Sequence, residues 1–147
     1  MARQQESGEF INEAMDAGLG EEFFNHALTP TNVGLLPQPD GYACPKGTCG
    51  DYIELYLRVR EERIVDARYM PEGCLYTVAC GSALTELIKG REVAAAVAVT
   101  PEELSEALGG LPKDHHHCAV LAVATLKAAV RDYQKKLREP WKKMYNR

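Results

Sequence analysis

The sequence lacks a long apolar run, a C-x-x-C pair and an excess of positive charge. Its longest apolar stretches, Val93–Val99 and Cys118–Leu126, are much shorter than the roughly 18 residues that a membrane-spanning helix needs. The 147 residues carry 17 Lys and Arg against 21 Asp and Glu, a formal charge of −4, which argues against binding nucleic acid through its phosphates. The first residues contain no signal-peptide-like apolar stretch, so we expect a single-domain protein of the cytoplasm.

The cysteines are odd in number and scattered, which does not suit a disulfide framework in a reducing compartment. The five cysteines are Cys44, Cys49, Cys74, Cys80 and Cys118. Four residues lie between the first two and five between the next two, so the spacing gives little support for a zinc ribbon or finger. In such a chain a cysteine is a buried hydrophobe, a reactive thiol or a metal ligand, and its local context has to decide.

Alternating polarity predicts the strands. Apolar and polar residues alternate strictly over Tyr52–Arg60 and again over Ile64–Met70, which predicts a hairpin with one buried face. A short edge strand is expected near Gly41–Cys44.

Helical periodicity and helix-ending residues predict the rest of the chain. Helices are expected over residues 9–17 and 21–28, from Gly73 to Gly90, within 93–99, over 100–108 and from about His115 to Pro140. The order of helix, antiparallel strands and then several helices predicts an α+β domain.

The C-terminal residues are basic. The segment Arg131–Arg147 contains seven Lys and Arg and only two acidic residues. Such a segment is either a solvated helix end or a surface that docks an acidic partner.

Three cysteines stand in contexts that favour a thiolate. Cys49 lies in a glycine turn before the strongest strand, Cys74 follows Gly73 at a helix start, and Cys118 follows His117 in the first turn of the last helix. The partial positive charge and free N–H groups of a helix N-terminus stabilise a thiolate. The pattern suits an anionic metal–sulfur centre, although each cysteine alone could be a small hydrophobe, Asp51 a turn residue and His117 a surface histidine.

Several motifs in order resemble one known family. They are FNHALTPTNVG at 24–34, Cys49-Gly50-Asp51, Gly73-Cys74, LTELIKG at 84–90, LGGLP at 108–112, His117-Cys118 and LKAA at 126–129. Together they resemble the IscU/NifU-type iron–sulfur cluster assembly scaffolds over about residues 22–133. We accordingly divide the chain into an extension with a short helix (1–21), a scaffold domain (22–139) and a basic tail (140–147).

The resemblance implies a fold, a function and a set of ligands. The fold is α+β, a three-stranded antiparallel sheet with helices packed on one face, as in SufE and NifU proteins. The function is that of a scaffold and carrier, not an enzyme. A cysteine desulfurase supplies persulfide sulfur, iron joins it, and a [2Fe–2S] cluster forms for transfer to apo-proteins. The implied ligands are Cys49, Cys74 and Cys118, with Asp51 or His117 in the fourth position, and zinc can replace the cluster.

The chemistry of a scaffold explains this ligand set. Three thiolates hold a cluster, while one harder carboxylate or imidazole ligand is more easily replaced and leaves the cluster labile. Receipt of sulfur requires an exposed thiol of low pKa. We expect Cys118 to be the sulfur acceptor, with Cys49 next.

Some residues depart from the family pattern. The segment Leu111–His115 replaces the Leu-Pro-Pro-Val-Lys motif read by a dedicated Hsp70-type chaperone, which argues against recognition by that chaperone. Cys80 falls on an apolar helix stripe, which favours packing. Cys44 remains a candidate spare ligand or redox partner.

Other functions are weighed against the scaffold. A zinc-bound, SufU-like sulfur acceptor is disfavoured because His117 is present and only 43 residues separate Cys74 from Cys118. A thiol enzyme with His117 as base is disfavoured because adjacent helical residues point about 100° apart. A purely structural zinc site, and the sharing of one cluster by two copies of the chain, remain open.

Overall fold

The computed structural model describes residues 18–45 and 50–139. The expected helix over 9–17, the basic tail 140–147 and Cys49 lie outside the described residues. In chain order the elements are α2 (Glu21–Leu28), β1 (Gly41–Ala43), β2 (Tyr52–Arg60), β3 (Arg63–Glu72), α3 (Leu75–Ile88), α4 (Val93–Ala96), α5 (Pro101–Ala107), the 3₁₀ turn η1 (Lys113–His115) and α6 (His116–Arg138).

The three strands form one antiparallel sheet in the order β1-β2-β3, as expected. The alternation along β2 is that of a sheet with one buried face, with Ile53, Leu55 and Leu57 fully buried. The hairpin between β2 and β3 turns at Glu61 and Glu62, both with positive φ. At the opposite end of the hairpin Tyr52 pairs with Glu72, so the start of β2 and the end of β3 lie side by side.

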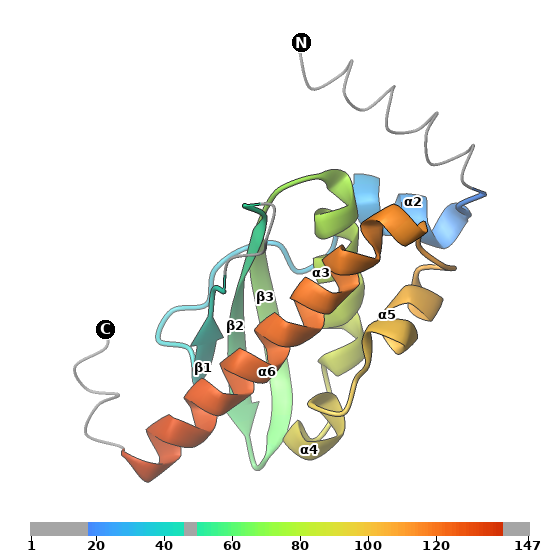
Figure 1. Ribbon diagram of the computed structural model, residues 1–147. Coiled ribbons are helices and arrows are strands. Elements are labelled where there is room, and N and C mark those ends of the chain that lie inside the picture. Colours follow the sequence, from blue (N-terminus) through green and yellow to red (C-terminus); the bar gives the residue numbers. More distant parts are fainter. Residues whose placement is uncertain (1–17, 46–49, 140–147) are drawn as a thin grey trace.

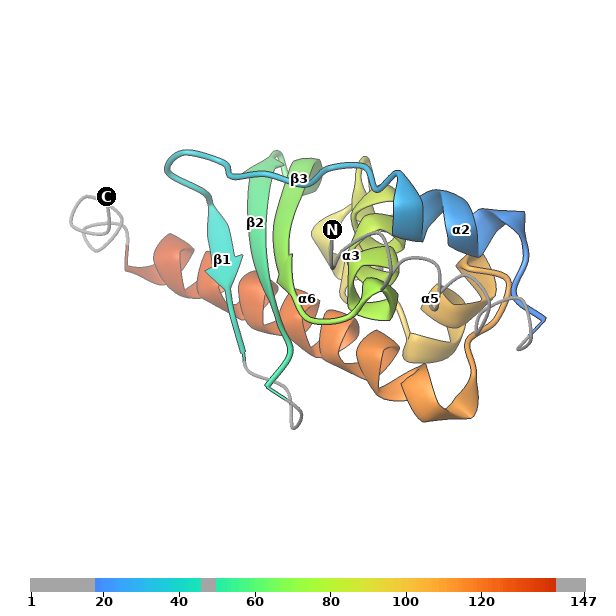
Figure 2. The ribbon, with the colours of Figure 1, turned by 90° about the horizontal axis from the view of Figure 1, so that it is seen from above.

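Helices α6 and α3 cover the buried face of the sheet. In Figure 1, α6 crosses β1 and β2, while α3 runs beside β3. Figure 2 shows α2 packed on the outside of α3, away from the strands. Gly81 permits α3 to pack closely on β3, because a Cβ at this position would overlap the ring of Tyr69 on β3. The predicted α+β fold, a three-stranded antiparallel sheet with helices on one face, is confirmed.

The helix ends follow the residues that predicted them. The Thr100 hydroxyl caps α5 by accepting a hydrogen bond from the Glu103 backbone N–H at 3.1 Å. Helix α3 ends two residues before Gly90, which has a φ of +84°. Helix α4, over Val93–Ala96, lies within the 93–99 segment where a helix was favoured. Helix α6 begins at His116, after the η1 turn, and not at His115.

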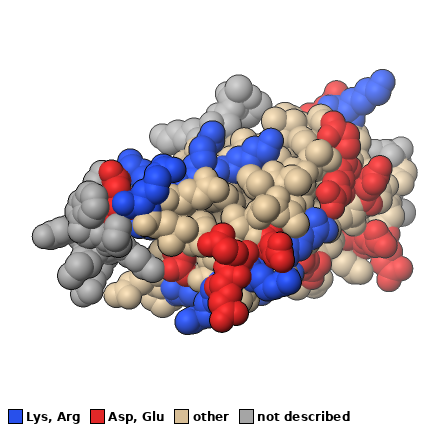
Figure 3. Space-filling view, turned by 90° about the horizontal axis from the view of Figure 1, so that it is seen from below, with Lys and Arg blue, Asp and Glu red and all other residues tan. Residues whose placement is uncertain are grey.

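Charge is unevenly distributed over the surface. Figure 3 shows Lys and Arg side chains gathered along α6 and Asp and Glu side chains gathered over α5. The exposed basic residues of α6 recur at intervals of three or four: Lys127, Arg131, Lys135 and Arg138. Within the ranges 18–45 and 50–139, no helix is long and apolar enough to cross a membrane.

Candidate metal and thiol site

The pairing of β2 with β3 brings Asp51 to the start of α3. Asp51 directly precedes β2 and Gly73 directly follows β3, so the Tyr52–Glu72 pair places them together. Gly73 has a φ of +150°, and a Cβ on it would lie 2.7 Å from Cγ of Asp51. Glycine before Cys74 is therefore required both for the backbone conformation and for the approach of the carboxylate.

Cys74 is the N-cap residue of α3 and its side chain is exposed. Its carbonyl oxygen accepts hydrogen bonds from the backbone N–H groups of Thr77 and Val78, at 3.0 and 3.2 Å. The thiol thus stands at the N-terminal end of a fourteen-residue helix, where the helix dipole favours negative charge.

Helix α6 delivers Cys118 and His117 to the same place. Cys118 is the third residue of α6, and its Sγ lies 3.7 Å from Nε2 of His117. The two side chains are thus in contact, although adjacent helical positions point about 100° apart. The rotation between adjacent helical positions separates the Cα–Cβ directions, but the histidine ring is long enough to turn back.

A buried hydroxyl lies at the centre of the group. The Thr77 side chain is fully buried, and its Oγ1 lies 3.6 Å from Sγ of Cys74, 3.6 Å from Sγ of Cys118 and 3.3 Å from Oδ2 of Asp51. Its single proton is donated to one of these three acceptors at a time. Sequence analysis missed Thr77, because a threonine on the apolar stripe of a helix carries no signal of its own.

The two sulfurs share a proton unequally. A hydrogen bond from the Cys118 thiol lowers the pKa of Cys74 to about 5, and the hydroxyl and backbone N–H of Thr77 assist, against the opposing effect of burial. The same bond, together with burial, raises the pKa of Cys118. Cys74 is therefore the thiolate of the pair and Cys118 the thiol.

This result corrects the physical basis on which Cys118 was expected to accept sulfur. Cys118 is fully buried and its pKa is raised, whereas an acceptor needs exposure and a low pKa. A helix start predicts stabilisation of a thiolate, but here two helix starts meet and the more exposed sulfur takes the negative charge. Cys74 has both properties that were expected of Cys118.

The side chains form two overlapping sets that could hold a metal ion. Ligand atoms of Asp51, His117 and Cys118 lie within 4.8 Å of one another, and so do those of Cys74, His115 and Cys118. Four of the five predicted ligands are thus brought together, and the fifth, Cys49, is outside the described residues. His115 was missed because only the histidine adjacent to the cysteine belongs to the motif.

The other two cysteines lie apart from these sets. Cys80 is fully buried within α3, in agreement with a packing role, and burial raises its pKa. Cys44 is partly buried just after β1 and belongs to neither set.

The fold and the site define a class of protein: a small α+β domain in which thiol, imidazole and carboxylate groups that could hold a metal ion gather at the meeting point of two helix N-termini. The chain belongs to the family described as the NifU-like N-terminal domain, which it matches over residues 20–140.

Named relatives and a solved structure are similar over most of the chain. The iron-sulfur cluster assembly scaffold protein IscU 1 of Archaeoglobus fulgidus is 37% identical over 117 residues, covering 79% of this chain and 76% of that protein. The nitrogen fixation protein NifU of Cereibacter sphaeroides is 41% identical over 113 residues, covering 76% of this chain and 44% of that protein. The crystal structure of a NifU-like N-terminal protein from Brucella abortus has the same fold, with a TM-score of 0.63, 17% identity and coverage of 80% and 94%.

Proposed function

We propose that this protein is a scaffold on which a [2Fe–2S] cluster is assembled from iron and persulfide sulfur and then passed to apo-proteins. The observation that carries the proposal is the convergence of Cys74, Cys118 and Asp51 around Thr77, with His117 in contact with Cys118. We assign Cys49 as the third thiolate ligand, on the strength of its Cys-Gly-Asp motif. Membership of the family supports the same function.

Sulfur receipt is a thiol exchange in this proposal. A thiolate of the chain attacks the outer sulfur of a persulfide on a cysteine desulfurase, and the desulfurase cysteine leaves as a thiolate. The persulfide S–S bond breaks and a new S–S bond forms on the scaffold, so no outside oxidant or reductant is needed for this step. The exposure and low pKa of Cys74 favour it as the first acceptor, and Cys118 would accept sulfur in a state that exposes its thiol. Cys49 is the other candidate acceptor.

Release of the cluster depends on the harder ligand. Asp51 accepts a hydrogen bond from Thr77 at 3.3 Å, and this bond holds its carboxylate beside the two sulfurs. A carboxylate or imidazole binds iron of a cluster less firmly than a thiolate does, so it is the first ligand that an incoming apo-protein replaces.

The partners follow from this chemistry. They are a cysteine desulfurase and apo-proteins that accept a cluster, and we place the reaction in the cytoplasm, where thiols stay reduced. The exposed basic residues of α6 (Lys127, Arg131, Lys135 and Arg138) favour partners with an acidic surface. Two copies of the chain could share one cluster, because the exposed Cys74 leaves one side of the site accessible.

Anaerobic reconstitution tests the proposal. The protein, ferrous iron, cysteine and a desulfurase are mixed, visible absorption is followed, and iron and sulfide are counted. We expect equal amounts of iron and sulfide and transfer to an apo-ferredoxin. A protein that binds only zinc and receives sulfur without forming a cluster would instead be the zinc-bound sulfur acceptor.

The variant Asp51→Ala tests the role of the harder ligand. We expect it to retain the cluster longer and to transfer it more slowly, because the easily replaced ligand is gone. Equal or faster transfer would contradict this account of release.

A further inference from the structure

Three consecutive histidines precede Cys118, and the structure separates their positions. The η1 turn ends at His115 and α6 begins at His116. This change of helix type puts His115 beside Cys74 and Cys118, and His117 beside Asp51 and Cys118. His116 belongs to neither set, although it lies between the other two in sequence.

The ring of His115 is held in place by an aromatic contact. It stacks on the ring of Tyr76 with a centroid separation of 3.6 Å and an interplanar angle of 7°. Tyr76 is itself only 2% exposed and packs against Phe23, with ring centroids 5.2 Å apart. The imidazole is therefore oriented before any ligand arrives, which lowers the entropic cost of binding.

We propose that His115 is a metal ligand, and that Cys74, His115 and Cys118 form a position for one divalent cation of the ferrous or zinc type beside the Asp51–His117–Cys118 set. The proposal rests on the proposed function only for which ion arrives there, since the ligand geometry exists without a cluster.

The geometry of the three residues suits a tetrahedral ion with one open position. Metal–sulfur bonds of about 2.3 Å and metal–nitrogen bonds of about 2.0 Å place tetrahedral ligands about 3.5 to 3.8 Å apart. The ligand atoms here lie within 4.8 Å, so each separation has to shorten by at most about 1.0 Å between the sulfurs and about 1.3 Å between sulfur and nitrogen. The exposed Cys74 side chain can supply most of that movement.

The two sets differ in chemistry and share one sulfur. Two thiolates and one imidazole prefer zinc or ferrous iron, whereas the set with the carboxylate is harder. Because Cys118 belongs to both sets, an ion at His115 lies next to the position for a second ion. His115 therefore gives the chain a position for one ion beside the Asp51–His117–Cys118 set.

Cobalt(II) binding by the cluster-free full-length protein tests the proposal. The variant His115→Phe keeps a ring to stack on Tyr76 but removes the nitrogen, and His116→Phe is the matched control. We expect His115→Phe to weaken cobalt binding at least about tenfold and to lower the intensity of its visible bands. The control should stay within about twofold of the natural protein. Natural affinity in His115→Phe, or an equal loss in His116→Phe, would overturn the proposal.

A second measurement keeps the test independent of folding and of the proposed function. X-ray absorption of His117→Phe loaded with one equivalent of zinc should still show one imidazole, and its absence would overturn the proposal. Reconstitution of clusters is followed separately. If the natural protein binds cobalt through His115 but never forms a cluster, the proposed function fails and the His115 site stands.

Discussion

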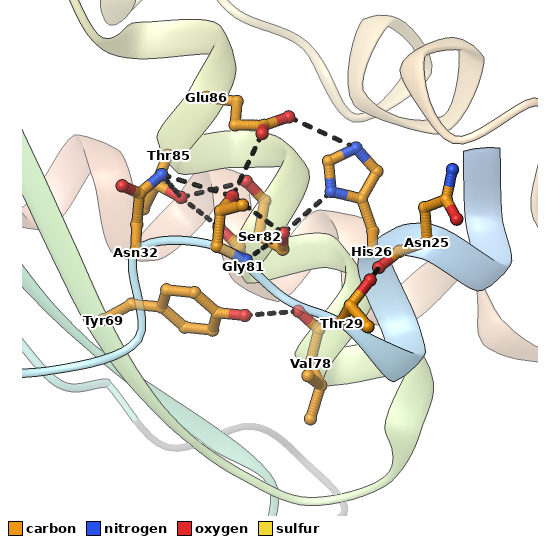
Figure 4. Close-up of polar contacts among 11 residues, drawn as sticks. Asn25, His26, Thr29, Asn32, Tyr69, Val78, Gly81, Ser82, Thr85 and Glu86 are labelled. Carbon is orange, nitrogen blue, oxygen red and sulfur yellow. Dashed lines mark hydrogen bonds and ion pairs between the residues drawn. The ribbon is translucent and has the colours of Figure 1, made fainter.

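Helix α3 carries two polar clusters that have opposite properties. The first, the latch cluster, consists of His26, Asn32, Ser82, Thr85 and Glu86, which are labelled in Figure 4, together with Thr31 and Lys89. The second, the thiol cluster, consists of Asp51, Cys74, Thr77, His117 and Cys118. The latch cluster takes its α3 residues from the second half of that helix. The thiol cluster takes its residues from the N-terminal end of the same helix.

The latch cluster satisfies itself with short hydrogen bonds. Oγ of Ser82 lies 2.7 Å from Nδ1 of His26 and accepts a hydrogen bond from the Thr31 backbone N–H at 3.1 Å. The thiol cluster is connected differently: its contacts with sulfur, at 3.6 to 3.7 Å, have the length expected of that larger atom, and two sulfurs and the Asp51 carboxylate share one Thr77 proton. The latch cluster, whose hydrogen-bonding groups are already paired, stabilises the fold. The thiol cluster, whose groups share one proton, can still bind a metal ion.

Part of the latch cluster has the connectivity of a catalytic triad but cannot act as one. Ser82, His26 and Glu86 are connected like the triad of a hydrolase, since Nε2 of His26 lies 3.4 Å from the Glu86 carboxylate. Ser82 is fully buried, however, and its oxygen is occupied by the Thr31 N–H. A substrate could not reach it, so the latch cluster ties the 29–34 segment to α3.

The largest expected effect is the loss of metal binding when the thiol cluster loses a sulfur. Replacing Cys74 or Cys118 by alanine should weaken zinc or cobalt binding by about a hundredfold or more, because a thiolate ligand is removed. Cys80→Ala, which removes a buried thiol outside the cluster, is the control and should bind normally. Competition with a chromophoric chelator measures the affinities. A similar loss in all three variants would show that metal binding does not depend specifically on the sulfurs of the thiol cluster.

The acidity of Cys74 gives the next prediction. Because its pKa is lowered to about 5, its alkylation by iodoacetamide should remain fast at pH 6 and fall by half only near pH 5. An ordinary thiol, with a pKa of about 8.5, loses its reactivity well above that pH. Removing the hydrogen-bond donor in Cys118→Ala should move the midpoint upward, as followed by peptide mass spectrometry. An unchanged midpoint would mean that Cys118 is not the cause.

The junction between the clusters gives a smaller effect. Gly81→Ala would push a methyl group into the Tyr69 ring and should lower the free energy of unfolding by about 1–3 kcal/mol. Gly20→Ala has open space around it and a negative φ, so it should cost less, namely only the poorer N-cap that alanine gives α2. Urea unfolding compares the two variants. Equal midpoints would show that α3 shifts enough to accommodate the added methyl group.

The smallest effect concerns the latch cluster. Ser82→Ala leaves the Thr31 N–H and the His26 ring without their partner and should cost about 1–2 kcal/mol of stability. Cobalt affinity should be unchanged, because no metal ligand is touched. Thr29→Val, which removes a single exposed bond to the Asn25 carbonyl, should cost less. A change of cobalt affinity in Ser82→Ala would show that the two clusters are coupled.

Local sequence patterns predicted most of the fold. Alternation over Tyr52–Arg60 predicted β2 because side chains on a strand face opposite sides of the sheet. Helix ends followed from Gly90 and from the Thr100 cap. The turn at Glu61 and Glu62 carries no glycine, so its positive φ angles could not be read from the residue types.

The family resemblance named Asp51, Cys74, His117 and Cys118 as ligands, and the structure brings these four residues together. The resemblance gave neither the electrostatics of the site nor the parts of Thr77 and His115, because burial is decided by packing between distant segments. For that reason the expectation that Cys118 is exposed was wrong. The role of Thr77 could not be predicted from the sequence either, because its partners come from separate segments of the chain.

Both outer margins of the sheet are already hydrogen-bonded within the part of the chain that is described. The Asp132 carboxylate accepts the Tyr42 backbone N–H of β1 at 2.9 Å. Along β3, Tyr69 bonds to Asn32 and Gly34, and Ile64 bonds to Gly90 and Arg91. A visiting protein therefore finds little free main chain on which to add a strand. We expect a partner protein to dock through side chains and loops and not by adding a strand to this sheet.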